Sequence, residues 1–151
     1  MYYWIDSGCT YTDSIPASVQ MWAYPGWWNP INLYQTSNYS SSTMDFYEYY
    51  DSNSNVYAYA ESYKYGASSP MPIYLKDSED WRYGRIYINE AKMLPQTPSR
   101  RKAIICHEMG HVFGLKDIDT SSSIMYRYGN LIPLQVTLDA NNAIVTKYPR
   151  D

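Results

Sequence analysis

The chain has 151 residues, of which 45% are hydrophobic and 18% charged, a balance typical of one folded domain with its own core. Its 12 basic and 15 acidic residues give a net charge of −3, which is not the basic surface of a nucleic-acid-binding protein. No apolar run approaches the ~20 residues of a membrane span. We therefore expect a single monomeric domain over residues 1–151, with no nucleic-acid partner and no membrane span.

The chain opens with a predicted strand and a predicted helix. The aromatic and β-branched run "YYWID" at residues 2–6 is typical of a strand. "DSIPASVQMWAY" predicts the first helix, with Asp13 or Ser14 as its N-cap and Pro16 near its first position. A Pro-Gly pair then ends this helix.

Short β-prone runs separated by Ser, Asn, Gly and Pro clusters fill residues 31–90. We expect four to five strands from the runs "INLYQTS", "MDFYEYYD", "VYAYAESY", "MPIYLK" and "GRIYINE". In "VYAYAESY", tyrosines alternate with small alanines, which suits a strand with one bulky face. This run is our candidate for an exposed sheet edge that pairs with an extended peptide.

Two further helices are predicted in the last third of the chain. "QTPSRRKAIICHEMGHVFG" has Thr97 as N-cap, Pro98 at the first helical position and Gly114 at its end. "TLDANNAIVTKY" begins at a Thr137 cap and carries an acidic residue in its first turn. Strands first and the major helices later predict an α+β domain with a mixed sheet.

The only two histidines of the chain, His107 and His111, stand four residues apart in the third predicted helix. Residues at this spacing share one helix face, so the two rings are placed to bind one metal ion. Imidazole nitrogens suit zinc, and a catalytic zinc site needs three protein ligands and a water. Glu108 then lies beside the metal, where it can accept a proton from that water.

The third ligand is expected from a downstream carboxylate, because no further histidine exists and no glutamate follows Glu108. Asp117, Asp119 and Asp139 are the candidates. Gly114 provides the left-handed turn that would bring the next residues back to the metal. This spacing favours Asp117, with Asp119 as the second choice.

The resulting motif, H-E-x-x-H-x-x-G-x-x-D, resembles the extended zinc-binding motif of the metzincin clan of endopeptidases. The clan's second signature, a turn containing methionine beneath the metal, is matched by Met125 and Tyr126 in "SSSIMYRYGN". This turn and the order of the elements look most like matrixins. The aspartate as third zinc ligand looks instead like snapalysin, a small secreted bacterial branch of the clan.

The resemblance implies one metzincin-like catalytic domain with a twisted, mostly parallel mixed β-sheet of about five strands and three helices. It implies a zinc-dependent endopeptidase that cuts internal bonds of protein or peptide substrates. His107, His111 and Asp117 would bind the zinc and Glu108 would act as general base. Gly114, Met125 and Tyr126 would support the site structurally. Arg127 stands where related families carry a metal-reaching tyrosine. A structural calcium ion, bound by main-chain carbonyls and aspartates, is compatible with the resemblance.

Two rival functions follow from the composition and the motif. The chain holds 19 tyrosines, which suits a secreted carbohydrate- or peptide-binding module with a latent or structural zinc site. A non-proteolytic zinc hydrolase is the second rival. Residues 1–8 do not form a signal peptide, so the protein is either intracellular or a mature domain whose leader was removed. We expect an extracellular, mature domain, because Tyr- and Ser-rich strands suit an extracellular surface. Cys9 and Cys106 are expected to be buried thiols in preference to a disulfide.

Overall fold

The computed structural model of the protein describes residues 1–64, 69–70, 81–129 and 131–149. In chain order its elements are β1 (Tyr2–Ile5), α1 (Ser14–Ala23), β2 (Tyr34–Gln35), the 3-10 turn η1 (Tyr39–Ser41), β3 (Met44–Tyr49), β4 (Ala58–Tyr63), β5 (Tyr83–Asn89), α2 (Glu90–Met93), α3 (Pro98–Val112) and α4 (Leu138–Lys147). The predicted α+β class is confirmed.

The sheet has five strands in the order β2-β1-β3-β5-β4. The first four run parallel, and β4 pairs antiparallel with β5. In register, Phe46 lies opposite Ile86, and Ile86 lies opposite Ala60. The predicted mostly parallel mixed sheet is therefore confirmed, and the last six residues of "VYAYAESY" form the edge strand β4.

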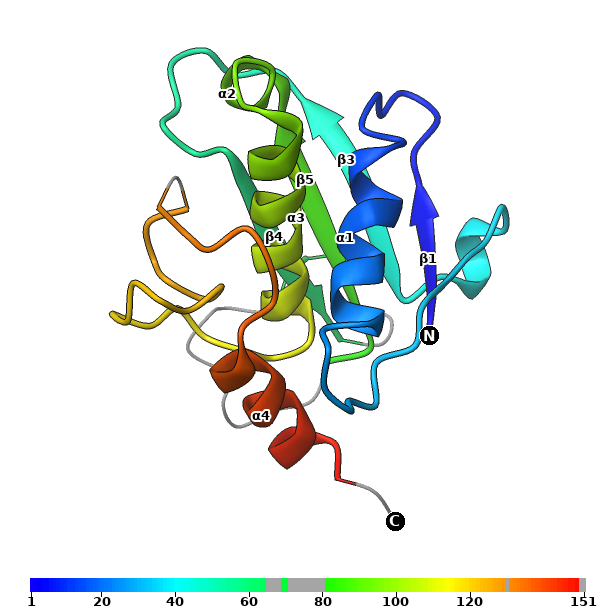
Figure 1. The fold of residues 1–151 in the computed structure, drawn as a ribbon. Helices are drawn as coiled ribbons and strands as arrows, with labels where there is room; N and C mark the ends of the chain where they lie inside the picture. The colour runs from blue at the N-terminus through cyan, green and yellow to red at the C-terminus, as the bar shows by residue number, and fades with distance from the viewer. Residues whose placement is uncertain (65–68, 71–80, 130, 150–151) are drawn as a thin grey trace.

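Helices α1 and α3 lie side by side on one face of this sheet (Figure 1). The indole Nε1 of Trp22 in α1 donates to the carbonyl oxygen of Cys106 in α3 at 2.8 Å. Its ring meets Phe113 edge-on, with centroids 5.3 Å apart. The strands contribute fully buried side chains such as Phe46 and Ile86 to the same core. Because these contacts are buried, they hold α3 in a fixed place above the sheet.

The opposite face of the sheet carries many of the tyrosines. Tyr47, Tyr87 and Tyr59 lie on adjacent strands, and their rings stack in pairs with centroids 5.4 and 4.9 Å apart and interplanar angles of 20° and 19°. Each ring thus covers part of its neighbour's face. This row packs the outer side of the sheet.

The three long helices begin where the sequence predicts, with Asp13, Thr97 and Thr137 at their N-cap positions. The short helix α2 and the turn η1 were not predicted. "INLYQTS" gives a strand of only two residues, Tyr34–Gln35. The predicted strand "MPIYLK" at residues 71–76 lies outside the described residues.

Both cysteines are buried free thiols, as expected. Burial raises the pKa of Cys9 to about 11, which makes it unreactive near neutral pH. Within the described ranges, no helix is long and apolar enough to cross a membrane.

Candidate metal centre

Local sequence signals define both ends of α3. The hydroxyl oxygen of Thr97 accepts from the main-chain N–H of Arg100 at 3.3 Å, and Pro98 takes the first helical position. At the other end Gly114 has φ +90° and its N–H donates to the carbonyl of His111 at 3.0 Å. Because glycine adopts this left-handed conformation without steric cost, the chain turns sharply there. The next residues return across the face that carries the histidines.

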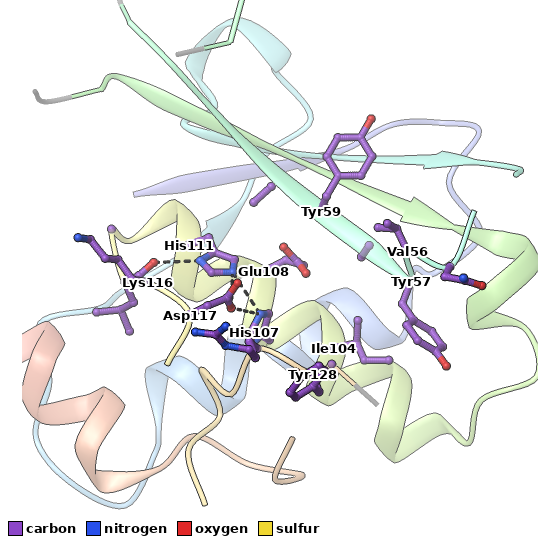
Figure 2. A pocket seen from close by; sticks show the side chains of 17 residues that line it. Val56, Tyr57, Tyr59, Ile104, His107, Glu108, His111, Lys116, Asp117 and Tyr128 are labelled. Atoms are coloured by element: carbon purple, nitrogen blue, oxygen red, sulfur yellow. Dashed lines mark hydrogen bonds and ion pairs between the residues drawn. The ribbon is translucent and has the colours of Figure 1, made fainter. Parts of the chain in front are cut away.

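Three side chains converge at this face. Nε2 of His107 and Nε2 of His111 are 3.1 Å apart. Oδ1 of Asp117 is 3.2 Å from the first nitrogen and 3.3 Å from the second. Ligand atoms that each lie 2.0–2.1 Å from one tetrahedral zinc ion are about 3.3 Å apart. The three atoms therefore fit the ligand triangle of a zinc site, as Figure 2 shows from the side of the cleft.

Two main-chain carbonyls orient the histidine rings. The oxygen of Ile124 accepts from Nδ1 of His107 at 2.7 Å, and that of Leu115 accepts from Nδ1 of His111 at 2.9 Å. A carbonyl can only accept, so each Nδ1 carries a hydrogen and each Nε2 keeps its lone pair in the neutral ring. This tautomer is the one that a metal ion requires from both histidines.

His111 and Asp117 have pKa values that are shifted in opposite directions. Burial lowers the pKa of His111, but its hydrogen bond to Asp117 and the charge of Glu108 outweigh burial, and the net pKa is raised above 6.5. Hydrogen bonds from His107 and His111 hold the pKa of Asp117 well below its usual range. The carboxylate is therefore ionised at neutral pH, ready to bind a cation.

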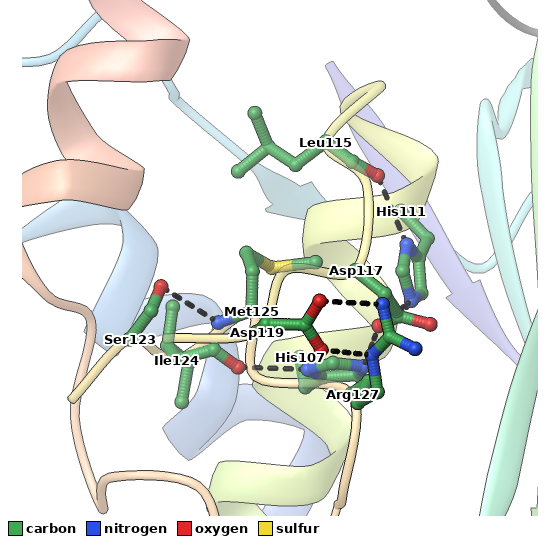
Figure 3. A network of polar contacts seen from close by, with 9 residues as sticks. All are labelled: His107, His111, Leu115, Asp117, Asp119, Ser123, Ile124, Met125 and Arg127. Atoms are coloured by element: carbon green, nitrogen blue, oxygen red, sulfur yellow. Dashed lines mark hydrogen bonds and ion pairs between the residues drawn. The ribbon is translucent and has the colours of Figure 1, made fainter. Parts of the chain in front are cut away.

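The segment that carries Asp117 is joined to the turn that contains methionine. The N–H of Ile118 donates to the carbonyl of Met125 at 2.9 Å, and the N–H of Arg127 donates to the carbonyl of Ile118 at 3.1 Å. The guanidinium of Arg127 also grips both carboxylate oxygens of Asp119, at 2.7 and 3.1 Å (Figure 3). Asp119 is thus engaged by Arg127, and Asp117 is the carboxylate that lies together with the two histidines.

Helix α4 holds the other side of this turn. The hydroxyl oxygen of Thr137 accepts from the N–H of Ile124 at 3.1 Å, and that of Ser123 accepts from the N–H of Met125 at 3.1 Å. Both hydroxyls donate to Asp139 and lower its pKa, against the effect of burial. Thr137 therefore occupies the predicted N-cap position, but its side chain makes no cap hydrogen bond to α4. Its hydroxyl binds the methionine-containing turn instead.

The methionine of the turn packs directly beneath α3. Met125 is 2% exposed, and a Cβ added at Gly110 would collide with its sulfur atom. The absence of a side chain at Gly110 thus allows the close approach. Tyr126 is partly buried against the core, and its ring lies 5.3 Å from that of Tyr128.

A cleft of about 750 Å³ opens above the three donor atoms, a size typical of ligand pockets. Glu108, 8% exposed, lines it next to His107. Edge strand β4 forms the opposite wall (Figure 2). Tyr128 is part of the lining, whereas Tyr126 is not.

The structure brings His107, His111, Glu108 and Asp117 to one cleft and leaves Asp119 and Asp139 in other roles. Within the described part of the chain, no second group of three His, Cys, Asp or Glu ligand atoms lies close enough to hold an ion. The expected calcium ion therefore gains no support. The roles of the Ile124 and Leu115 carbonyls could not be predicted from the sequence, because every residue has a main-chain carbonyl.

Two histidines one helical turn apart, with a glutamate after the first and a carboxylate beside both, are typical of zinc metalloproteases. The family model described as Matrixin matches residues 35–148, more than half of the chain, and the chain belongs to the matrixin family. The predicted matrixin-like resemblance is confirmed, and family membership implies a catalytic zinc ion. A comparison with curated proteins gives no match.

Proposed function

We propose that the protein is a zinc-dependent endopeptidase in which His107, His111 and Asp117 hold the metal ion. The observation that carries this proposal is the triangle of Nε2, Nε2 and Oδ1 atoms, 3.1–3.3 Å apart, with both Nδ1 atoms bonded to carbonyls. No fourth His, Cys, Asp or Glu joins the triangle among the described residues. A site with three protein ligands favours catalysis over a closed structural site.

The metal and Glu108 divide the chemistry between them. When bound, zinc lowers the pKa of water and polarises a peptide carbonyl. Glu108 takes a proton from the water whose oxygen attacks the scissile carbon. It then delivers this proton to the amine nitrogen as the carbon–nitrogen bond breaks. Its place one residue after His107 and its position in the cleft lining support this role.

The substrate is proposed to lie extended along β4. The carbonyl of Tyr57 accepts from the N–H of Asn89 at 2.9 Å, so Tyr57 directs its main-chain groups toward β5. Main-chain groups alternate along an antiparallel strand, which turns those of Ala58 and Ala60 toward the open edge. Both alanines line the cleft. Strand pairing engages peptide on both sides of the scissile bond, which favours internal cleavage.

The rival binding module gains less support. On the outer face of the sheet, Tyr47, Tyr87 and Tyr59 stack on one another, so part of each ring is covered against a sugar. The non-proteolytic hydrolase is weakened by the strand edge beside the metal triangle, which suits an extended peptide more than a small ester or amide.

The test is to incubate the zinc-loaded protein with a complex peptide mixture and identify the products by mass spectrometry. The Glu108→Ala variant, with equal zinc content, is the control. Internal cuts made by the wild type alone are expected. Equal product sets from the two proteins would contradict the role of Glu108, and no internal cuts by either would contradict the endopeptidase.

A further inference from the structure

Strand β5 ends at Asn89, a fully buried asparagine whose side chain bonds to a loop and not to the sheet. Its Oδ1 accepts from the N–H of Asp51 at 3.0 Å. Its Nδ2 donates to the carbonyl of Asp51 at 2.9 Å and to that of Val56 at 3.0 Å. One amide group thus ties both ends of loop 50–57, which joins β3 to β4.

The loop also has hydrogen bonds of its own. Oδ1 of Asp51 accepts from the N–H groups of Asn53 and Ser54 at 2.9 and 3.1 Å. The N–H of Val56 donates to the hydroxyl oxygen of Ser54 at 3.0 Å. The loop is therefore a closed turn, and Asn89 is its attachment to the sheet.

The same loop forms one wall of the cleft. Val56 and Tyr57 line it together with Ile104 and Tyr128. In Figure 2 these four side chains lie on the side of His107, at the end of the cleft away from Lys116. These four side chains are apolar or aromatic, and the position of two of them depends on the loop.

We propose that Asn89 is a positioning residue for substrate selection, which fixes the Val56–Tyr57 wall and with it the size of side chain that this end of the cleft accepts. The inference rests on the proposed peptidase function. An amide is required because it donates two hydrogen bonds and accepts one at the same point. A carboxylate of the same size can only accept, so it would face the carbonyls of Asp51 and Val56 with no hydrogen to offer.

The experiment compares peptides that are identical except for leucine or alanine at one position, moved stepwise across the scissile bond. For each pair, kcat and KM give a leucine-to-alanine selectivity. In Asn89→Asp, the selectivity is expected to fall roughly 10-fold at the position facing the Val56–Tyr57 wall, mainly through KM, because one apolar contact discriminates by about 10–200-fold. Positions at the Lys116 end should keep their selectivity.

A matched control uses the same substitution at another buried asparagine. Asn141 is 2% exposed, and its amide ties the loop at Trp28 and Asn29 to α4 at 3.2 and 3.1 Å. Asn141→Asp should lower stability without changing selectivity at any position. Asp51→Ala is the second loop variant, because it removes the internal turn bonds from a partly exposed site.

The outcomes separate this inference from the peptidase proposal. The role of Asn89 is overturned if Asn89→Asp folds and its leucine-to-alanine selectivity is unchanged. If Asn89→Asp does not fold, unchanged selectivity in Asp51→Ala overturns it. A uniform loss for both peptides also overturns it, since that is a purely structural effect. Should the wild type cut no peptide, the peptidase proposal fails. The deciding measurement is then peptide binding to zinc-loaded Glu108→Ala, with and without Asn89→Asp. For each protein the dissociation constants of the leucine and alanine peptides give a binding selectivity. A lower binding selectivity with Asn89→Asp supports the inference, and an unchanged selectivity or no binding overturns it.

Discussion

The carbonyl oxygen of Ile124 lies 2.7 Å from Nδ1 of His107 and fixes the tautomer of that histidine. Ile124 is itself held by Thr137, whose hydroxyl oxygen accepts its N–H. The first histidine of α3 is thereby connected to the start of α4, 30 residues further along the chain. Residues that orient a metal ligand in this way affect metal affinity without touching the metal.

The Thr137→Val variant should bind zinc roughly 10-fold more weakly, because it removes the acceptor of the Ile124 N–H at nearly constant side-chain volume. Chelator competition measures the dissociation constant. Thr137→Ser keeps the hydroxyl and should retain most of the affinity. Equal zinc affinity in Thr137→Val and the wild type would show that Thr137 does not act on the metal site.

Asp117 and Asp119 form a natural pair for testing the third ligand. Asp117→Asn should weaken zinc binding by two orders of magnitude or more, because it removes a charged donor from a site with three ligands. Asp119→Asn loses only a solvent-exposed ion pair with Arg127, worth about 1 kcal/mol or less. Zinc titration of both variants gives the comparison, and equal losses would contradict the choice of Asp117.

Zinc affinity should fall as the pH drops through the raised pKa of His111. Below that pKa a proton occupies the nitrogen that the metal needs. Asp117 does not compete, because its pKa is held well below the usual range. Dissociation constants measured across neutral and mildly acidic pH provide the test. An affinity that does not change as the pH falls below 6.5 would contradict the assignment of His111.

The metal-free protein should show the opposite trend in stability. Because the folded-state pKa of His111 is raised, its contribution is fully present below the unfolded value of 6.5 and is lost as the pH rises through the folded value. The contribution of Asp117, whose pKa is lowered, is present above 3.8 and lost in strong acid. Urea unfolding of the chelated protein should therefore give a lower free energy of unfolding at alkaline pH. Asp117→Asn should flatten this dependence.

Gly110→Ala should destabilise the fold by about 1–3 kcal/mol, because its methyl group would collide with the sulfur of Met125 inside the core. Gly129→Ala is the matched control, since nothing lies within 4 Å of an added Cβ there. Thermal unfolding of both variants gives the difference. Equal stability would mean that the methionine turn moves away without cost.

Helix α3 was predictable because its signals are local. Thr97, Pro98 and Gly114 mark its ends, and the spacing of His107 and His111 defines the metal-facing side. The choice between Asp117 and Asp119 was not decided by spacing alone. It depends on the bridge between Ile118 and Tyr126 and on the engagement of Asp119 by Arg127.

Other parts of the fold depend on contacts between distant segments. Asn89 reads as the last residue of a strand, and its role emerges only when loop 50–57 folds over it. Strand β2 is shorter than "INLYQTS" suggests: it spans only Tyr34–Gln35, and the N–H of Ile31 donates to the side chain of Asn29 and not to a strand. Such pairings leave no periodic pattern in the sequence.

The most direct test of the metal centre is anomalous diffraction at the zinc absorption edge from crystals of the zinc-loaded protein. The account predicts a single strong peak in the cleft, within bonding distance of Nε2 of His107, Nε2 of His111 and a carboxylate oxygen of Asp117. A peak ligated by Asp119, or no peak between the two histidines at full zinc loading, would contradict it.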